Sequence, residues 1–237
     1  MQHIGIVGCS AEGASLCYRT ICIKGAEILG PHTHPQISMH THSLSDYIVC
    51  LVAGDMEGLG RIMLDSARQL ARSGADFIIC PDNTIHQAFE RIQPESPLPW
   101  LHIADPVVHE AQMHRYQKIG LLGTRWLVDS SVYPDKFVAA GMSYARPSVE
   151  DRDGVSRIIM DELVYGIFKP ESIFFLQGVI KRLQEQGCDA VLLGCTELPL
   201  VLNNDVSALP TLDSTRLLAT AAVWRSVKSD PITHAAA

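Results

Sequence analysis

The stretch Gly187-Cys-Asp-Ala-Val-Leu-Leu-Gly-Cys-Thr-Glu197 has a counterpart earlier in the chain, Gly74-Ala-Asp-Phe-Ile-Ile-Cys-Pro-Asp-Asn-Thr84. In both, a glycine suited to ending a helix precedes an Asp, an apolar run typical of a buried strand, and a polar tripeptide. The alignment sets Asp82 against Cys195. An internal repeat of this kind predicts that the chain consists of two related halves.

A second pair of similar segments is separated by nearly the same number of residues. Ile4-Gly-Ile-Val-Gly-Cys resembles Ile119-Gly-Leu-Leu-Gly-Thr. Open parallel sheets bind ligands at the carboxyl ends of their strands. We therefore expect two facing lobes with both polar tripeptides in one cleft. Residues 1–103 with 213–237 form the first predicted α/β lobe, and residues 104–212 form the second.

Short runs rich in Ile, Val and Leu alternate with longer amphipathic segments throughout the chain, which is typical of parallel sheets covered by helices. The predicted class is α/β. The expected strands are Ile4–Val7, Tyr47–Val52, Phe77–Ile79, Lys118–Leu122, Ser143–Ala145 and Ala190–Leu193. The expected helices are Gly13–Ile23, Met56–Ser73, Arg152–Tyr165 and Ser172–Gln186.

Composition narrows the class of protein. The chain has 237 residues, is 47% apolar and carries a formal charge of −7, which repels nucleic acid. It has no apolar run of the roughly 18 to 20 residues that a membrane span needs. Its N-terminus lacks the features of a signal peptide. We expect a cytoplasmic protein that binds neither nucleic acid nor membrane.

The cysteines and histidines do not suggest a metal site. The seven cysteines form no Cys-x-x-Cys pair and no disulfide framework. His32, His34, His40 and His42 form two His-x-His pairs without a nearby carboxylate or cysteine, so we interpret them as loop or surface residues. No metal is expected.

Cys195 is the strongest candidate for chemistry. It follows a predicted strand and precedes a turn or helix start, where backbone N–H groups can stabilise a thiolate. Such a thiolate can act as a base or a nucleophile.

The motifs resemble those of the aspartate/glutamate racemase family, which needs no cofactor. Gly194-Cys-Thr-Glu-Leu-Pro199 is similar to the second-half signature of that family, and Asp82-Asn-Thr-Ile-His86 to the first-half signature Cys-Asn-Thr-x-His. The segment Leu121-Leu-Gly-Thr-Arg125 with Tyr133, and the opening Gly5-Ile-Val-Gly8, are also family-like. The resemblance spans nearly the whole chain.

The resemblance implies two pseudo-twofold-related Rossmann-like lobes, often in a homodimer, that bind a small amino acid between them without pyridoxal phosphate or metal. Two groups on opposite faces of the substrate exchange its Cα proton, which inverts the configuration. The implied catalytic residues are Cys195 and Asp82. The implied substrate-binding residues are Ser10, Asn83, Thr84, Thr124, Thr196 and Glu197.

Asp82 departs from the family pattern, because the resemblance implies a cysteine there. A carboxylate with an ordinary pKa near 3.9 is a poor proton donor at neutral pH unless burial raises that pKa. Cys80 lies two residues earlier and could replace it only after a local rearrangement. Four hypotheses stay open. The first choice is an asymmetric racemase or epimerase. The others are a single-cysteine decarboxylase, a cis–trans isomerase and a small-acid binding protein without turnover.

Several neighbouring residues also have two interpretations. Ser10 could contact a carboxylate or cap a helix, and His86 could tune Asp82 or be structural. Arg125 could bind a distal carboxylate, cap a helix or form a surface ion pair. Trp126-Leu-Val128 replaces the Gly-Thr-Met common in the family, so Leu127 could face the cleft or pack in the core.

Overall fold

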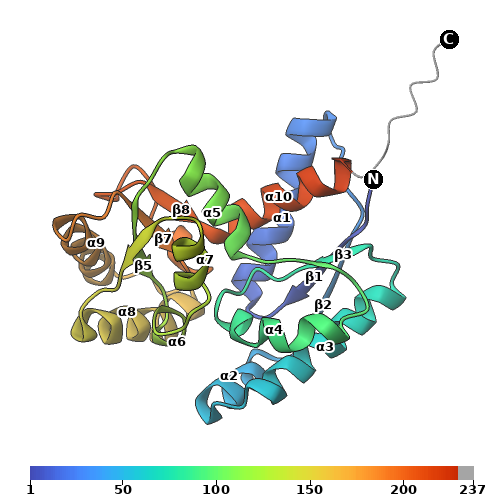
Figure 1. Cartoon of the computed structure of the whole chain (residues 1–237), viewed down its shortest axis with the longest axis horizontal. Coiled ribbons are helices and arrows are strands. Elements are labelled where there is room, and N and C mark those ends of the chain that lie inside the picture. Colours follow the sequence, from blue (N-terminus) through green and yellow to red (C-terminus); the bar gives the residue numbers. More distant parts are fainter. Residues whose placement is uncertain (229–237) are drawn as a thin grey trace.

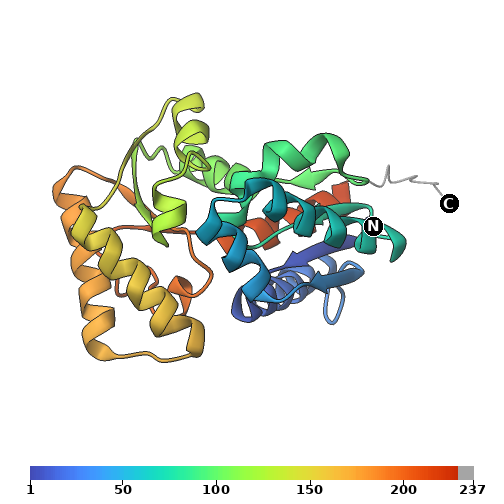
Figure 2. The same cartoon turned by 90° about the horizontal axis from the view of Figure 1, so that it is seen from below.

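The computed structural model describes residues 1–228 and forms two lobes, each built on a four-stranded parallel sheet (Figures 1 and 2). The strand order is β2-β1-β3-β4 in the first sheet and β6-β5-β7-β8 in the second. The predicted α/β class is thus confirmed. Residues 229–237, assigned above to the first lobe, lie outside the described range. The strands are β1 (Ile4–Gly8), β2 (Ile37–Thr41), β3 (Phe77–Ile79), β4 (Trp100–Leu101), β5 (Lys118–Leu122), β6 (Ser143–Ala145), β7 (Ala190–Leu193) and β8 (Thr211–Asp213).

Helices cover both faces of each sheet. The α-helices are α1 (Ala11–Leu29), α2 (Leu44–Ala53), α3 (Met56–Arg72), α4 (Phe89–Ile92), α5 (Ala104–Met113), α6 (Arg125–Val128), α7 (Pro134–Ala139), α8 (Val149–Asp161), α9 (Pro170–Glu185) and α10 (Ser214–Lys228). Short 3₁₀ turns are η1 (Thr84–Ala88), η2 (Gln93–Glu95), η3 (Leu163–Tyr165) and η4 (Leu198–Leu200). Within residues 1–228, none of the helices combines the length and apolarity that a membrane crossing requires.

The internal repeat corresponds to a structural repeat. Gly74 and Gly187 both have positive φ, +83° and +86°, the left-handed conformation that ends a helix. Two residues after each glycine, an Asp accepts a hydrogen bond from the backbone N–H of the residue that precedes the neighbouring strand. Asp76 accepts from His3, before β1, and Asp189 accepts from Gln117, before β5, each at 2.7 Å. The same local device therefore joins helix and sheet in both lobes.

The prediction of a strand at Tyr47–Val52 is wrong, because these residues belong to α2. Tyr47 and Leu51 are buried, whereas Val49 and Val52 are 67% and 70% exposed, which is helical periodicity. Gly54, in the left-handed conformation, closes the helix. A short apolar run fits a strand or a helix face equally well, and here the helix forms.

The second strand of the first sheet is instead β2, which pairs in parallel with β1. It lies at the sheet edge and is only partly buried. Its sequence, Ile-Ser-Met-His-Thr, lacks the continuous apolar run of the central strands. The alternation of a half-exposed edge strand is too weak a signal at this length, so this strand was not predicted.

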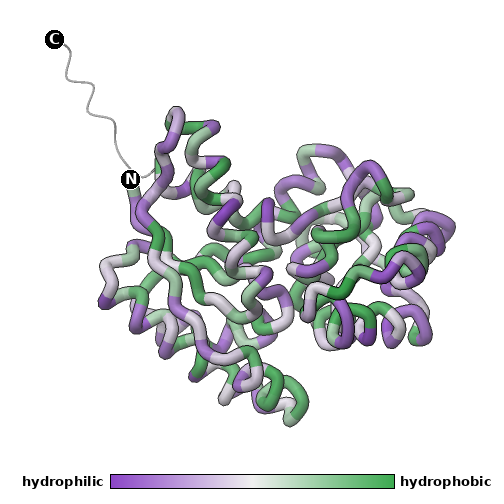
Figure 3. Tube along the Cα trace, turned by 180° about the vertical axis from the view of Figure 1, so that it is seen from behind, coloured by the Kyte–Doolittle hydropathy of each residue, from purple (hydrophilic) through white to green (hydrophobic). Residues whose placement is uncertain are grey.

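Alternate residues of the central strands enter different cores. Ile4 and Ile6 of β1 and Leu121 of β5 join one core that extends through both lobes, whereas Ile78 and Leu193 face separate outer cores. Helix α10 contacts both α1 and α5 and contributes to the shared core. Hydrophobic segments, green in Figure 3, run through the middle of both lobes. The two lobes therefore share a hydrophobic core as well as a cleft.

Candidate active site

A cavity of about 50 Å³ lies where loops from the two lobes meet, and all eight candidate site residues line it. They follow the carboxyl ends of the central strands β1, β3, β5 and β7, where parallel sheets present their loops. The candidates brought together are Ser10, Asp82, Asn83, Thr84, Thr124, Cys195, Thr196 and Glu197.

Hydroxyl groups join the two lobes on one side of this cavity. Ser10 Oγ lies 3.2 Å from Thr196 Oγ1 and accepts the Gly13 backbone N–H at 3.1 Å, so Ser10 also caps α1. The lobes approach closely here: a Cβ at Gly13 would lie 2.5 Å from Thr196 Cγ2. Both interpretations of Ser10 are thus compatible with its position, since it caps the helix and lines the cavity.

A second set of polar contacts joins the lobes on the side of Asn83. Thr84 Oγ1 lies 3.2 Å from Thr124 Oγ1, and the buried Tyr133 hydroxyl donates to Asn83 Oδ1 at 2.5 Å. This contact fixes the orientation of the Asn83 amide. Its Nδ2 is buried and has no hydrogen-bond partner within the described residues. An unpaired buried donor costs free energy, so Asn83 is suited to bind an acceptor on a ligand.

Cys195 lies beside a carboxylate of its own loop. Its Sγ donates to Glu197 Oε2 at 2.8 Å, and Thr196 Oγ1 donates to the same oxygen at 2.8 Å. Burial raises the pKa of the Cys195 thiol, and the Glu197 charge raises it further. The resting group is therefore a thiol hydrogen-bonded to a carboxylate that can receive its proton.

Asp82 has a thiol partner that the sequence did not reveal. The Cys9 thiol, which follows β1, lies near the Asp82 carboxylate and lines the same cavity. Burial raises the pKa of Asp82, and the negative charge of Glu197 contributes in the same direction. Burial also raises the pKa of Cys9, with Asp82 adding to the effect. The only sequence signal for Cys9 was its position at the end of a central strand.

Local hydrogen bonds hold the Asp82 loop in place. Asp82 Oδ1 accepts the Ile85 backbone N–H at 3.1 Å, and His86 Nδ1 lies 2.6 Å from the Asp82 carbonyl oxygen. His86 Nε2 accepts the Ile103 N–H at 3.4 Å, so the Nδ1–H donates to that carbonyl. His86 contacts the backbone of Asp82 rather than its carboxylate and has a structural position.

The positions of four other residues decide between the interpretations that the sequence left open for them. Cys80 is fully buried in the outer core of the first lobe and does not line the cavity. Arg125 is exposed and lies 3.6 Å from Asp153 in a surface ion pair. Leu127 packs in the core, and Trp126 lines the cavity instead. None of the first three contributes to the cavity wall.

The opposite wall of the cavity is apolar and comes mainly from α2, α6 and α8 with η3. Sequence reasoning missed these residues because their contacts depend on how the helices pack over the strand ends. Apolar members of the wall are Leu44, Ile48, Leu51, Trp126, Ile159, Met160 and Val164. No Lys, Arg or His is among the described residues that line this cavity.

A wider outer cavity of about 320 Å³ adjoins the inner one. The two share Cys9, Ser10 and Glu197, and the outer cavity extends to Glu12 and His42. Because the two cavities share lining residues, a ligand can reach the inner cavity through the outer one.

Comparison with known proteins gives consistent results. The family model described as Asp/Glu/Hydantoin racemase matches residues 4–222. The broad specificity amino-acid racemase RacX of Bacillus subtilis is 29% identical over 172 residues, which cover 71% of this chain and 73% of RacX. The glutamate racemase of Corynebacterium diphtheriae is 30% identical over 143 residues, and the match spans 52% of that enzyme.

Solved structures agree over nearly the full length. A crystal structure described as an Asp/Glu racemase from Yersinia pestis superposes with a TM-score of 0.87 at 30% identity, covering 95% of this chain and 99% of that one. An aspartate racemase homologue from Pyrococcus horikoshii OT3 gives a TM-score of 0.82 at 26% identity, with the same coverage.

Proposed function

The chain belongs to the Asp/Glu/hydantoin racemase family, and from this premise we propose that it inverts the Cα of a small amino acid by a two-base mechanism that needs no cofactor. Family membership supports amino-acid racemase activity, which is an isomerase reaction. The proposal adds that Cys195 and Asp82 exchange protons with opposite faces of the substrate, and that Asp82 does so through the thiol of Cys9.

One observation supports this mechanism above the alternatives: a thiol–carboxylate pair from each lobe lines the same cavity. Cys195 pairs with Glu197, and Cys9 pairs with Asp82. A decarboxylase that protonates a single face needs only one such pair. A binding protein needs neither. Two pairs suit a reaction that removes a proton on one side and returns one on the other.

The proton balance follows from charge. Burial raises the pKa of Asp82, and the negative charge of Glu197 raises it further. We infer that the two pairs share one extra proton. The pair that lacks it takes the Cα proton through its sulfur while the thiol proton passes to the carboxylate. The pair that holds it delivers a proton to the opposite face. One turnover exchanges the two states, and no net proton is consumed.

The substrate carboxylate is proposed to bind near Asn83. The unpartnered Nδ2 donor supplies one hydrogen bond, and Thr84 and Thr124 supply hydroxyl groups beside it. Removal of the Cα proton moves negative charge onto this carboxylate. Donors that are already fixed stabilise that charge without reorganisation. In this proposal Thr196 orients Glu197 through its hydroxyl, and the contact between Ser10 and Thr196 joins the two lobes.

The cavity wall favours a neutral side chain on the substrate. An aspartate or glutamate substrate would add a second carboxylate to a cavity that already holds Asp82 and Glu197 and no basic side chain among its described lining residues. The apolar wall from α2 and α8 suits a short apolar side chain instead. We propose a small neutral amino acid in place of the aspartate-like substrate that the motifs implied.

Exchange in heavy water tests the proposal. Each enantiomer of a set of neutral and acidic amino acids is incubated with the chain in D₂O and followed by NMR and chiral chromatography. We expect the opposite enantiomer with deuterium at Cα, and faster turnover of short neutral amino acids. An acid that binds but acquires no Cα label contradicts racemisation, and release of carbon dioxide would indicate a decarboxylase.

A further inference from the structure

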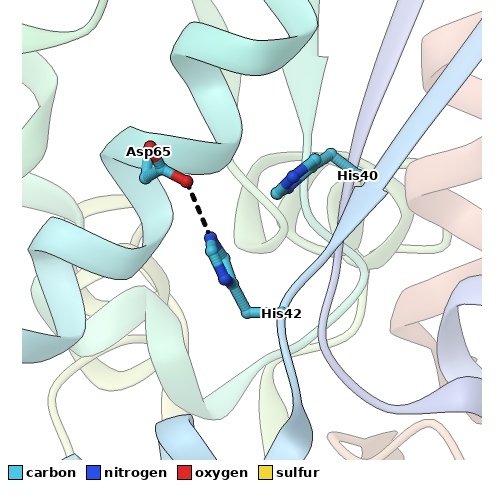
Figure 4. A group of neighbouring side chains, drawn as sticks. All are labelled: His40, His42 and Asp65. Atoms are coloured by element: carbon cyan, nitrogen blue, oxygen red, sulfur yellow. Dashed lines mark hydrogen bonds and ion pairs between the residues drawn. The ribbon is translucent and has the colours of Figure 1, made fainter.

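Two histidines and a carboxylate outside the proton-transfer site form a cluster that the sequence did not suggest. His40 lies in the edge strand β2, and His42 follows two residues later, so the extended chain directs both imidazoles to the same side. Helix α3 packs against this strand and brings Asp65 to the same place (Figure 4). The missing carboxylate that argued against a metal site is thus supplied by tertiary structure.

The three side chains are spaced like metal ligands. His42 Nε2 lies 2.9 Å from Asp65 Oδ2, and the His40 ring stands edge-on to His42 with centroids 5.0 Å apart. One ligand atom from each residue lies within 4.8 Å of the other two. Ligand atoms at right angles around a metal at about 2.1 Å are about 3.0 Å apart, which the His42–Asp65 distance matches. A rotation of the half-buried His40 closes the set.

A hydrogen bond to His40 determines which of its ring nitrogens is available to a metal. Its Nδ1 lies 3.0 Å from the hydroxyl of buried Ser66, which leaves Nε2 as the nitrogen for a metal. An imidazole nitrogen with a free lone pair is the donor that a divalent transition metal binds.

We propose that His40, His42 and Asp65 bind one divalent transition-metal cation, with water completing its coordination. Two imidazoles and one carboxylate favour metals such as Zn²⁺, Ni²⁺ or Co²⁺ over Mg²⁺ or Ca²⁺, which prefer oxygen ligands. The site is distinct from the proton-transfer cavity and does not depend on the proposed function.

The position of the site indicates what the metal does. His42 lines the outer cavity, and two residues later α2 begins at Leu44, which lines both cavities. Helix α2 carries Ile48 and Leu51 to the inner wall. A metal held by β2, α3 and the residue before the α2 N-cap would fix the start of this helix against the sheet. We infer a structural cation that stabilises the apolar wall of the active site.

Calorimetric titration of the untagged, chelator-treated chain with Ni²⁺ tests the site. We expect one equivalent to bind, and binding to weaken at least tenfold in His42→Ala, His40→Ala and Asp65→Asn. The matched control is the double variant His32→Ala/His34→Ala, which removes the other His-x-His pair. Full affinity in His42→Ala, equal loss in the control, or no stoichiometric binding by the parent chain would overturn the proposal.

Co²⁺ distinguishes this site from the thiols of the inner cavity. Coordination by imidazole and carboxylate gives visible absorption without the strong near-ultraviolet band of a cobalt–thiolate bond. We expect such a spectrum in the parent chain and in Cys195→Ser. A thiolate band that disappears in Cys195→Ser would place the metal in the inner cavity and contradict the assignment. Circular dichroism of each variant separates lost binding from lost folding.

A thermal measurement supplies a readout besides binding. Because a cation that binds only the folded chain raises its Tm, saturating Ni²⁺ should raise the Tm of the parent and of His32→Ala/His34→Ala but not that of His42→Ala. An equal rise in all three would show that the cation stabilises the fold from elsewhere.

Discussion

The loops after β3 and β7 occupy equivalent places in two lobes of the same strand order, yet they assemble a thiol–carboxylate pair in different ways. After β7, Cys195 and Glu197 lie two residues apart in one loop. In the first lobe, Asp82 follows β3, and its thiol, Cys9, comes from the end of the neighbouring strand β1. The fold sets where the reactive groups lie, whereas the chain segment that supplies each group differs between the lobes.

The largest expected effect is the loss of the sulfur in the second lobe. Cys195→Ala removes the proton-transfer group of one face, so we expect racemase kcat to fall by about 10³-fold or more. Cys22→Ala, which removes a cysteine outside both cavities, is the matched control and should retain full activity. Turnover is measured by chiral chromatography. Near-normal turnover of Cys195→Ala would contradict the role of Cys195 as the proton-transfer group of the second lobe.

The next effect tests the equivalent position in the first lobe. Asp82→Asn keeps an oxygen to accept the Ile85 N–H but removes the acid, so we expect kcat to fall by about 10²-fold with little change in stability. Deuterium exchange from the two enantiomers should become unequal, since one face loses its base. Equal losses from both enantiomers would assign Asp82 to substrate binding rather than to one face.

A smaller effect is expected for the thiol that Asp82 acquires from β1. Cys9→Ser replaces the thiol next to the carboxylate with a hydroxyl, which is a weaker carrier of the proton, so we expect kcat to fall by roughly 10-fold to 10²-fold with KM little changed. Its matched control is Cys80→Ser, whose sulfur also lies near Asp82 but faces the core. Unchanged turnover in Cys9→Ser would mean that Asp82 reaches the substrate directly.

The last prediction concerns stability rather than turnover, at the contact that holds the lobes together. Gly13→Ala places a Cβ 2.5 Å from Thr196 Cγ2, so the lobes must separate, and we expect the free energy of unfolding to fall by about 1–3 kcal/mol. Gly178→Ala in α9, where the nearest atom to the new Cβ is Arg182 Nη1 at 3.4 Å, is the control and should be neutral or slightly stabilising. Chemical denaturation measures both. Similar values for the two variants would show that the lobe contact at Thr196 is not tight in solution.

The predicted homodimer stays a prediction, and its test is the mass of the chain in solution.

Much of the candidate site could be predicted because its sequence signals are local. Gly74 and Gly187 end helices, Asp76 and Asp189 join the sheets, and parallel strands direct their carboxyl ends to one edge. Together with the family-like motifs, these features predicted the candidate site residues, including Asp82 and Cys195, that line one cavity. The same local reasoning failed at Tyr47–Val52, where a short apolar run fits both a strand and a helix.

Sequence by itself determined the α/β class, the two related halves and the polar loops that meet between them. Only the tertiary structure placed Cys9 beside Asp82, packed α2 and α8 over the inner cavity, and brought Asp65 to His40 and His42. The physical reason is the range of the interactions. Strand and helix patterns record which face of an element is buried, whereas contacts between distant elements depend on how those faces pack, which no short pattern specifies.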